Sequence, residues 1–284
     1  MNKKYFRKLW YSLSAKQRYW VRQLYYLPAD LLDRIKGKRN KYVPPRGAIY
    51  TGSASGAEKF LASGKHQLGL LISEIDLKPD DSVLDIGSGI GRTAIALIEH
   101  MSPQGSYEGF DVVKRGVDWC NKKITRDFPN FNFTYVPLFN DLYNNSKTSA
   151  LEFEFPYAEN QFDKIYSFSV FTHMMVDEIQ HYLHQIKRVL KEDGLAMSTF
   201  FLYDDSSEEM ISSNEGFGFP VKHDGFRLMN SKVKSGNIAI HKDLLSKMLD
   251  AADLEATQIA DGFWKGTEGA KEYQDIVVFR NKLQ

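Results

Sequence analysis

The sequence predicts an α/β fold built on a mostly parallel, doubly wound sheet. Short apolar runs alternate along the chain with segments that have helical periodicity. One of these runs, Val83–Ile86, is followed by the glycine-rich turn Gly87–Gly91 and then by a helix-like segment, 92–99. The chain has 284 residues, 43% of them hydrophobic, which suits one α/β domain with an appendage or two small domains.

The expected elements begin at residue 56 and alternate in type. Helices are expected at 56–76, 92–99, 117–128, 176–190 and 241–252, and strands at 83–86, 106–111, 131–136, 162–168, 194–202, 254–259 and 275–280. Residues 203–238 interrupt the alternation, and their Ser, Gly and Asn content with scattered aromatics predicts a long insert. Long loops inside a compact domain are commonly functional.

The first 42 residues differ from the rest and are expected to form a helical arm, followed by one domain at 43–284 that contains the insert. Residues 1–41 carry twelve lysines or arginines and two aspartates, a formal charge of +10, whereas the remainder carries −9. Aromatic residues alternate with these bases, and Pro28 predicts a helix break. The arm could lie on an anionic membrane, contact an acidic glycan or nucleic acid, or pack as an ordinary helix with its aromatics buried.

Cysteine usage and hydropathy limit the other possibilities. The single cysteine, Cys120, excludes an intrachain disulfide and a cysteine-rich metal site, and it favours a reducing compartment. No apolar run approaches the roughly 18 residues that span a bilayer. The basic N-terminus lacks the apolar core of a signal peptide, so we expect a cytoplasmic protein.

The glycine-rich turn indicates a nucleotide-like ligand at the carboxyl edge of the sheet. A dinucleotide fingerprint needs Gly-x-Gly-x-x-Gly, but Arg92 occupies the place of its last glycine. Asp85 precedes the turn by two residues, where a carboxylate would repel a phosphate and attract an ammonium or sulfonium group. Asp111 ends the next apolar run, where a carboxylate can bind two ribose hydroxyls.

The pattern D-x-G-x-G-x-G at 85–91 resembles motif I of the class I S-adenosylmethionine (SAM) methyltransferases. Further matching stretches resemble one bacterial branch of this family and cover most of residues 43–280: VPPRG (43–47), YEGFDVV (107–113), FPY (155–157), FDKIYSFSVFTHM (162–174), YLHQIKRVLKEDG (182–194), TFFL (199–202) and QDIVVF (274–279). The resemblance implies a Rossmann-like, seven-stranded sheet whose last strand is antiparallel. It also implies SAM as methyl donor and a place in polysaccharide or secondary metabolism.

The resemblance also implies roles for individual residues. Asp85 would orient the methionine amine or the loop around it, and Asp111 would bind the ribose. Relatives place an Asp after the third strand for the adenine amine, and here Asn140 or Asp141 would substitute for it. The implied cofactor-binding residues are Asp85, Gly87, Ser88, Gly89, Ile90, Gly91, Asp111, Val112, Asn140 and Ser169.

Methyl transfer to a hydroxyl needs an aligned acceptor and a base. In this fold the carboxyl end of the fourth strand faces the methyl group, and that stretch, Ser167–His173, contains neither a metal-binding acid nor the Asn/Asp-Pro-Pro-aromatic signature suited to amines. His173 is therefore the candidate catalytic base, because its ordinary pKa lies near neutrality. The alternative is that His173 caps the following helix or bonds the backbone. No metal ion is expected.

Four further residues are candidates for contact with the acceptor. Phe171 lies beside the expected base, and Trp264 could stack on a substrate or simply pack in the core. His223 and Arg227 lie in the insert among aromatics, a mixture that suits sugar recognition or belongs to an ordinary surface loop.

Several functions are consistent with these features. The first is O-methylation of a hydroxyl on a sugar, glycan or glycolipid intermediate. Alternatives are methylation of a membrane-associated lipid, quinone or polyketide, and a SAM-binding protein without transfer activity. A nicotinamide-dependent dehydrogenase is disfavoured by Arg92 and by the missing Tyr-x-x-x-Lys pair. The expected partners are a small-molecule or glycan acceptor and, through residues 1–41, the inner face of a membrane, with nucleic acid not favoured.

Overall fold

The computed structural model describes most of the chain. The described residues are 13, 15–37, 40–50, 56–140, 144–145, 148–214, 216–231 and 236–282. Asp141, one candidate for the adenine amine, lies outside them, as does most of the arm before residue 15.

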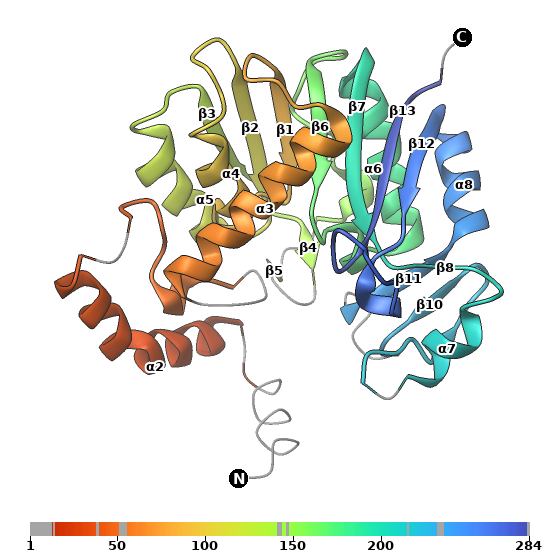
Figure 1. Cartoon of the computed structure of the whole chain (residues 1–284), viewed down its shortest axis with the longest axis horizontal. Helices are drawn as coiled ribbons and strands as arrows, with labels where there is room; N and C mark the ends of the chain where they lie inside the picture. Colours follow the sequence, from red (N-terminus) through yellow and green to blue (C-terminus); the bar gives the residue numbers. More distant parts are fainter. Residues whose placement is uncertain are drawn as a thin grey trace.

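The centre of the molecule is a seven-stranded sheet with the order β12-β13-β7-β6-β1-β2-β3 (Figure 1). The strand β13 runs antiparallel to both of its neighbours, and the other pairings are parallel. The predicted doubly wound sheet with an antiparallel last strand is therefore confirmed. Its strands are β1 (Ser82–Ile86), β2 (Ser106–Asp111), β3 (Phe131–Tyr135), β6 (Phe162–Ser167), β7 (Leu190–Phe200), β12 (Leu254–Ala260) and β13 (Asp275–Asn281).

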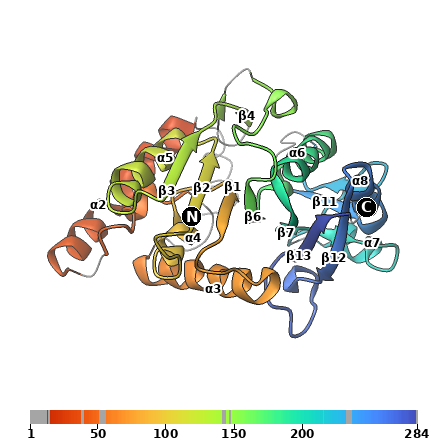
Figure 2. The ribbon, with the colours of Figure 1, turned by 90° about the horizontal axis from the view of Figure 1, so that it is seen from above.

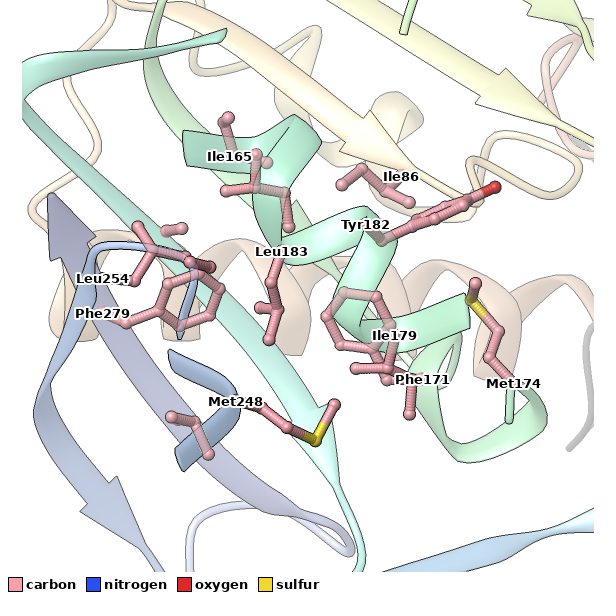
Figure 3. Packing of buried hydrophobic residues seen from close by; sticks show 14 of the residues in the cluster. Ile86, Ile165, Phe171, Met174, Ile179, Tyr182, Leu183, Met248, Leu254 and Phe279 are labelled. Carbon is pink, nitrogen blue, oxygen red and sulfur yellow. The ribbon is translucent and has the colours of Figure 1, made fainter. Parts of the chain in front are cut away.

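Helices cover both faces of this sheet, and Figure 2 shows α3 and α6 on opposite sides. One buried cluster is built from residues of α3, α4 and α5, and the other from α6 and α8. The helix α6 buries the stripe Ile179, Leu183 and Ile186, because residues spaced by three and four share one face. Figure 3 shows Ile179 and Leu183 of this stripe among the core residues. The helices are α3 (Ala57–Ile75), α4 (Arg92–Leu97), α5 (Lys114–Cys120), α6 (Val176–Val189) and α8 (Lys242–Ala251).

The order of the strands places the switch point of the sheet between β1 and β6. The chain runs from β1 outward through β2 to β3 and then returns to pair β6 with the other side of β1. The loops after β1 and β6 therefore diverge, and ligands of open α/β sheets bind in the crevice that forms at such a point.

The insert is a folded unit rather than a long loop. It contains α7 (Glu208–Ser213), β9 (Val221–Lys222) and β10 (Phe226–Leu228), and a four-stranded sheet forms with β8 (Leu202–Tyr203) and β11 (Ile238–His241). Its aromatic residues explain why the insert is folded, because Phe217 and Phe219 pack against Phe201 and Trp264 in a small separate core.

The arm contains the helix α2 (Ala15–Ile35), which packs on a short 3₁₀ turn, η1 (Arg46–Ala48). The predicted break at Pro28 is wrong, because the helix continues through this residue. Figure 1 shows α2 and the small sheet of the insert beyond the carboxyl ends of the parallel strands, on opposite sides. Within the described ranges, no helix has the length and apolar character needed to cross a membrane.

Candidate functional site

The turn after β1 depends on its glycines. Gly87, Gly89 and Gly91 have φ angles of 79°, 61° and 80°, in the left-handed region that side chains disfavour. A side chain on Gly87 would overlap Val170 of the β6 loop. The backbone nitrogens of Gly87 and Ser88 both donate to the carbonyl of Phe110, at 2.9 and 3.0 Å, so the turn is fixed to the end of β2.

The far side of the turn rests on α5. A Cβ added to Gly91 would lie 2.9 Å from Cys120 Sγ, so only glycine fits between the turn and this helix. Cys120 is fully buried, and burial raises the pKa of its thiol well above the usual value. The cysteine is thus a packing residue that fixes the distance between α5 and the glycine turn.

Two other residues of the turn point inward. Ile90 is 1% exposed and belongs to the core cluster on the α3–α5 face, so only its backbone faces a ligand. Ser88 is also buried, and its Oγ has no hydrogen-bond partner among the described residues. Since buried hydroxyls are almost always bonded, Ser88 Oγ is a group that a bound ligand would satisfy.

Asp111 holds the end of β2 against the turn. Its Oδ2 accepts from the Gly89 nitrogen at 2.9 Å, and its Oδ1 accepts from the Val113 nitrogen at 2.7 Å. The Tyr50 hydroxyl lies 3.5 Å from the same Oδ1. Burial raises the pKa of Asp111 to about 6, against the opposing effect of these donors. The residue is therefore mainly ionised at neutral pH and presents a carboxylate where a ribose is expected. Val112 is half-buried beside it.

Asp85 lies beneath the turn and is held by two tyrosines. The hydroxyls of Tyr107 and Tyr166 donate to its Oδ2 at 2.7 and 2.9 Å, from β2 and β6 respectively. Burial raises the pKa of Asp85 to about 7, and the two hydroxyl donors oppose that rise. The arrangement puts a carboxyl group that titrates near neutrality at the switch point of the sheet.

The carboxyl end of β6 carries a strained residue. Ser169 has a φ of 58°, which is uncommon for a residue with a side chain. Its nitrogen donates to Thr199 Oγ1 and its hydroxyl to Gln274 Oε1, both at 2.8 Å. The exposed Ser169 is thus positioned by the end of β7 and by the residue before β13.

His173 and Phe171 follow in a 3₁₀ turn, η4 (Phe171–His173). The His173 ring is half-buried, and its backbone nitrogen donates to Val170 O at 2.9 Å. Phe171 is fully buried against Phe200, and Figure 3 shows it among Ile179 and Met174. The ring of Phe171 lies inside the core, so its expected acceptor contact stays a prediction without support from this position.

The other three candidates for contact with the acceptor, two in the insert and one after β12, differ in their exposure. Arg227 is 6% exposed and binds Glu208 at 2.7 Å and Phe219 O at 2.8 Å, so its guanidinium is occupied within the insert and does not face an acceptor. Trp264 is buried and donates to Asp275 at 2.8 Å, which makes it a packing residue. His223 is exposed and stacks on Phe226 at 4.5 Å, so it alone of these three stays accessible.

Sequence reasoning missed the residues that support the two carboxylates. Tyr107 and Tyr166 could have been found from strand register, since Asp85 pairs with Gly109 on one side and with Tyr166 on the other. Tyr50 and Arg115 left no such signal. The Arg115 guanidinium lies 5.0 Å from the Tyr50 ring and 4.6 Å from the Tyr19 ring of α2, which connects the arm to the site.

A family model described as a methyltransferase domain matches residues 83–194, from β1 into β7. The chain carries a class I SAM-dependent methyltransferase domain. It is accordingly a SAM-dependent methyltransferase, and the glycine turn, the orphaned Ser88 hydroxyl and the Asp111 carboxylate fit SAM. The side chain of Asn140 lies outside the described part, so its predicted adenine contact stays a prediction.

Solved structures share the methyltransferase fold. A SAM-dependent methyltransferase from Clostridium acetobutylicum is 13% identical, with a TM-score of 0.52, and the match covers 92% of this chain and 100% of that one. The CcbJ methyltransferase from Streptomyces caelestis is 13% identical, with a TM-score of 0.54 and coverage of 86% and 99%. The [4+2]-cyclase SpnF is 16% identical, with a TM-score of 0.53 and coverage of 94% and 97%. At such identities the similarity shows the fold alone.

Proposed function

We propose that this methyltransferase acts on a hydroxyl of a sugar, glycan or glycolipid intermediate, with His173 as the base. The observation that carries the proposal is the position of His173 in η4, four residues beyond the strained Ser169 at the end of β6. Within Ser167–Met175 it is the only side chain of a type whose ordinary pKa lies near neutrality. A hydroxyl acceptor needs such a group, whereas a free amine carries its own nucleophilic lone pair.

The proposed step balances as a direct displacement. When bound, SAM supplies a methyl group on a positively charged sulfur. The acceptor oxygen forms a bond to this carbon as the carbon–sulfur bond breaks, and the hydroxyl proton passes to the neutral His173 ring. Asp111 and the glycine turn hold the donor, so that the contribution of the protein is mainly alignment and proton removal.

A membrane-associated lipid, quinone or polyketide is the second candidate acceptor. The exposed apolar side chains of α2, such as Leu24 and Ile35, favour it, because they lie on the helix that reaches the site through Tyr50 and Arg115. Both candidates have hydroxyl acceptors and share the proposed base. In either case we place the protein in the cytoplasm, at the inner face of the membrane.

Methyl transfer from labelled SAM to a panel of acceptors tests the proposal. The panel includes glycans, glycolipids, phenolic quinone precursors and polyketides, together with primary amines as a contrasting class. We expect label in a base-stable, ether-linked methyl group on a hydroxyl of a sugar-containing acceptor. Transfer only to amines, or SAM binding with no transfer to any class, would contradict it.

A further inference from the structure

The helix α2 docks on the rest of the protein through its polar face. Asp30 accepts from the Arg46 nitrogen at 2.9 Å, and Asp33 forms an ion pair of 2.8 Å with the Arg46 guanidinium. Arg22 donates to the carbonyl of Ile49. These contacts, with Arg115 over the Tyr19 ring, place charged and polar groups of α2 against the body.

The outward face of α2 is apolar, which reverses the usual arrangement of a surface helix. In the described part of the chain, thirteen large hydrophobic side chains are exposed, and eight of them belong to this helix. Leu24, Tyr25 and Ile35 are 70%, 76% and 82% exposed. The eight, which we call the outer face, are Trp20, Val21, Leu24, Tyr25, Leu27, Leu31, Leu32 and Ile35.

The interpretation of the arm as an ordinary packed helix with buried aromatics does not fit Trp20 and Tyr25, whereas Tyr19 and Tyr26 are half-buried. Trp20 is 57% exposed, and the spacing of Trp20, Leu24, Leu27 and Leu31 keeps these side chains on one side of the helix. A contiguous exposed apolar surface of this kind marks a site of interaction. Figures 1 and 2 both show α2 at the periphery of the molecule, outside the layers around the sheet.

The charge of the arm identifies the partner. Residues 1–41 carry a formal charge of +10, so a second copy of the arm would be repelled, whereas an anionic lipid surface would attract it. Tryptophan and tyrosine side chains such as Trp20 and Tyr25 suit the boundary between headgroups and acyl chains. The charged inner face, with Asp30 and Asp33, keeps the helix from entering the bilayer core.

We propose that α2 lies in the headgroup layer of an anionic phospholipid membrane, with its outer face toward the acyl chains and its polar face on the methyltransferase body. This docking holds the carboxyl edge of the sheet beside the bilayer. The helix α2 binds the segment Arg46–Ile49, and the next residue, Tyr50, contacts Asp111 at that edge. The acceptor is then an amphiphile whose hydroxyl-bearing head emerges from the same membrane. This last step rests on the proposed function, while the docking itself does not.

Vesicle flotation of the full-length protein tests the docking. The vesicles are phosphatidylcholine alone or phosphatidylcholine mixed with phosphatidylglycerol, each at low and high salt. The variant Leu24→Ser/Leu31→Ser/Ile35→Ser removes apolar surface from exposed positions only. The matched control, Ile72→Ser/Ile259→Ser/Phe263→Ser, changes three side chains that are also exposed but lie on α3, β12 and the β12–β13 loop.

We expect salt-sensitive binding to the phosphatidylglycerol vesicles, weakened at least about tenfold by the α2 variant and unchanged in the control, because burial of the three apolar side chains among the acyl chains stabilises the bound state. SAM affinity by calorimetry should be equal in all three proteins, which shows that they are folded. The docking would be overturned if wild type and the α2 variant bound the vesicles equally, or if wild type did not bind them. It would also be overturned if wild type and the control were dimers and the α2 variant were a monomer. Methyl transfer to soluble acceptors is measured separately, so a failure of the proposed function is distinguished from a failure of docking.

Discussion

The backbone nitrogen of Gly89 donates a hydrogen bond of 2.9 Å to Asp111, 22 residues later in the chain. The carboxylate that is predicted to bind the ribose therefore also fixes the glycine turn, which is predicted to wrap the rest of the ligand. The two parts of the cofactor site are one hydrogen-bonded unit, and a change at either residue should disturb the other.

Replacement of Asp111 should separate its structural and binding roles. Asp111→Asn keeps an acceptor for the Gly89 or Val113 nitrogen, so it should fold and lose SAM affinity by roughly 10-fold, since charge-assisted bonds contribute about 1.5–3 kcal/mol. Asp111→Ala leaves both buried nitrogens without this partner and should also lower the free energy of unfolding by about 1–3 kcal/mol. Calorimetry and urea unfolding measure the two effects. An Asn variant with wild-type SAM affinity would show that another group holds the ribose.

The conformation of the turn should be as important as its charge. Gly89→Val should abolish SAM binding, because the left-handed backbone at φ 61° disfavours a branched side chain and the side chain would enter the ligand space. Gly37→Val is the matched control: Gly37 has the same φ of 61°, and no atom lies within 4 Å of its added Cβ. Calorimetry on both folded variants should show loss only for Gly89→Val. Near-normal affinity in that variant would mean that the turn does not line the site.

The raised pKa of Asp85 predicts a pH dependence of stability. A carboxyl whose folded pKa is about 7 favours the folded state while it is protonated, and this stabilisation disappears as the pH rises through about 7. Asp85→Asn remains neutral. Between about pH 4 and pH 8, the stability of the variant relative to wild type should therefore increase by roughly 4 kcal/mol. Urea unfolding across this range measures the difference. A difference that does not change with pH would show that the pKa of Asp85 in the folded protein lies outside this range.

The same substitution should weaken SAM binding at pH 8, because a neutral amide cannot attract the ammonium or sulfonium charge. In wild type the affinity should rise with pH as Asp85 ionises, and in Asp85→Asn this rise should be absent or smaller. Opposite effects on stability and affinity in one variant are not expected from a residue that only fills space.

Catalysis by His173 makes a separate prediction. His173→Ala should lower turnover by roughly 10²–10⁴-fold with SAM affinity nearly unchanged. The wild-type rate should rise with pH through the neutral range, because only the neutral ring accepts the hydroxyl proton. His184→Ala is a suitable control, since this histidine of α6 is exposed and its ring lies 3.2 Å from the side-chain amide of Gln180. A His173→Ala enzyme that retains most of its turnover on the true acceptor would exclude the role as base.

Much of the fold could be predicted from the sequence because its signals are local. The run Val83–Ile86 and its glycines define a strand and a turn within ten residues, and the stripe on α6 is visible as periodicity. The conformation of the insert was not predictable in this way. It depends on contacts between residues that are distant in the sequence, such as those of Phe217 and Phe219 with Trp264.

The site was predicted in part for the same reason. Asp85, Asp111 and the glycines belong to one local pattern. The side-chain roles of Phe171 and Arg227 were not local, because the sequence around a phenylalanine beside the candidate base is the same whether its ring faces a ligand or the core. The orientation of α2 was also hidden, since an amphipathic pattern shows that two faces differ but not which one meets the protein.

The buried position of Cys120 against Gly91 makes its thiol a probe of local opening of the structure. A thiol reagent reaches this sulfur only when α5 and the glycine turn move apart, and the raised pKa of the thiol slows any reaction before that opening. Because Cys120 is the only cysteine in the chain, every labelling event reports that one movement. The labelling rate therefore measures how often α5 and the glycine turn separate. If SAM binds at this turn, it should slow the labelling in proportion to the fraction of protein that it occupies.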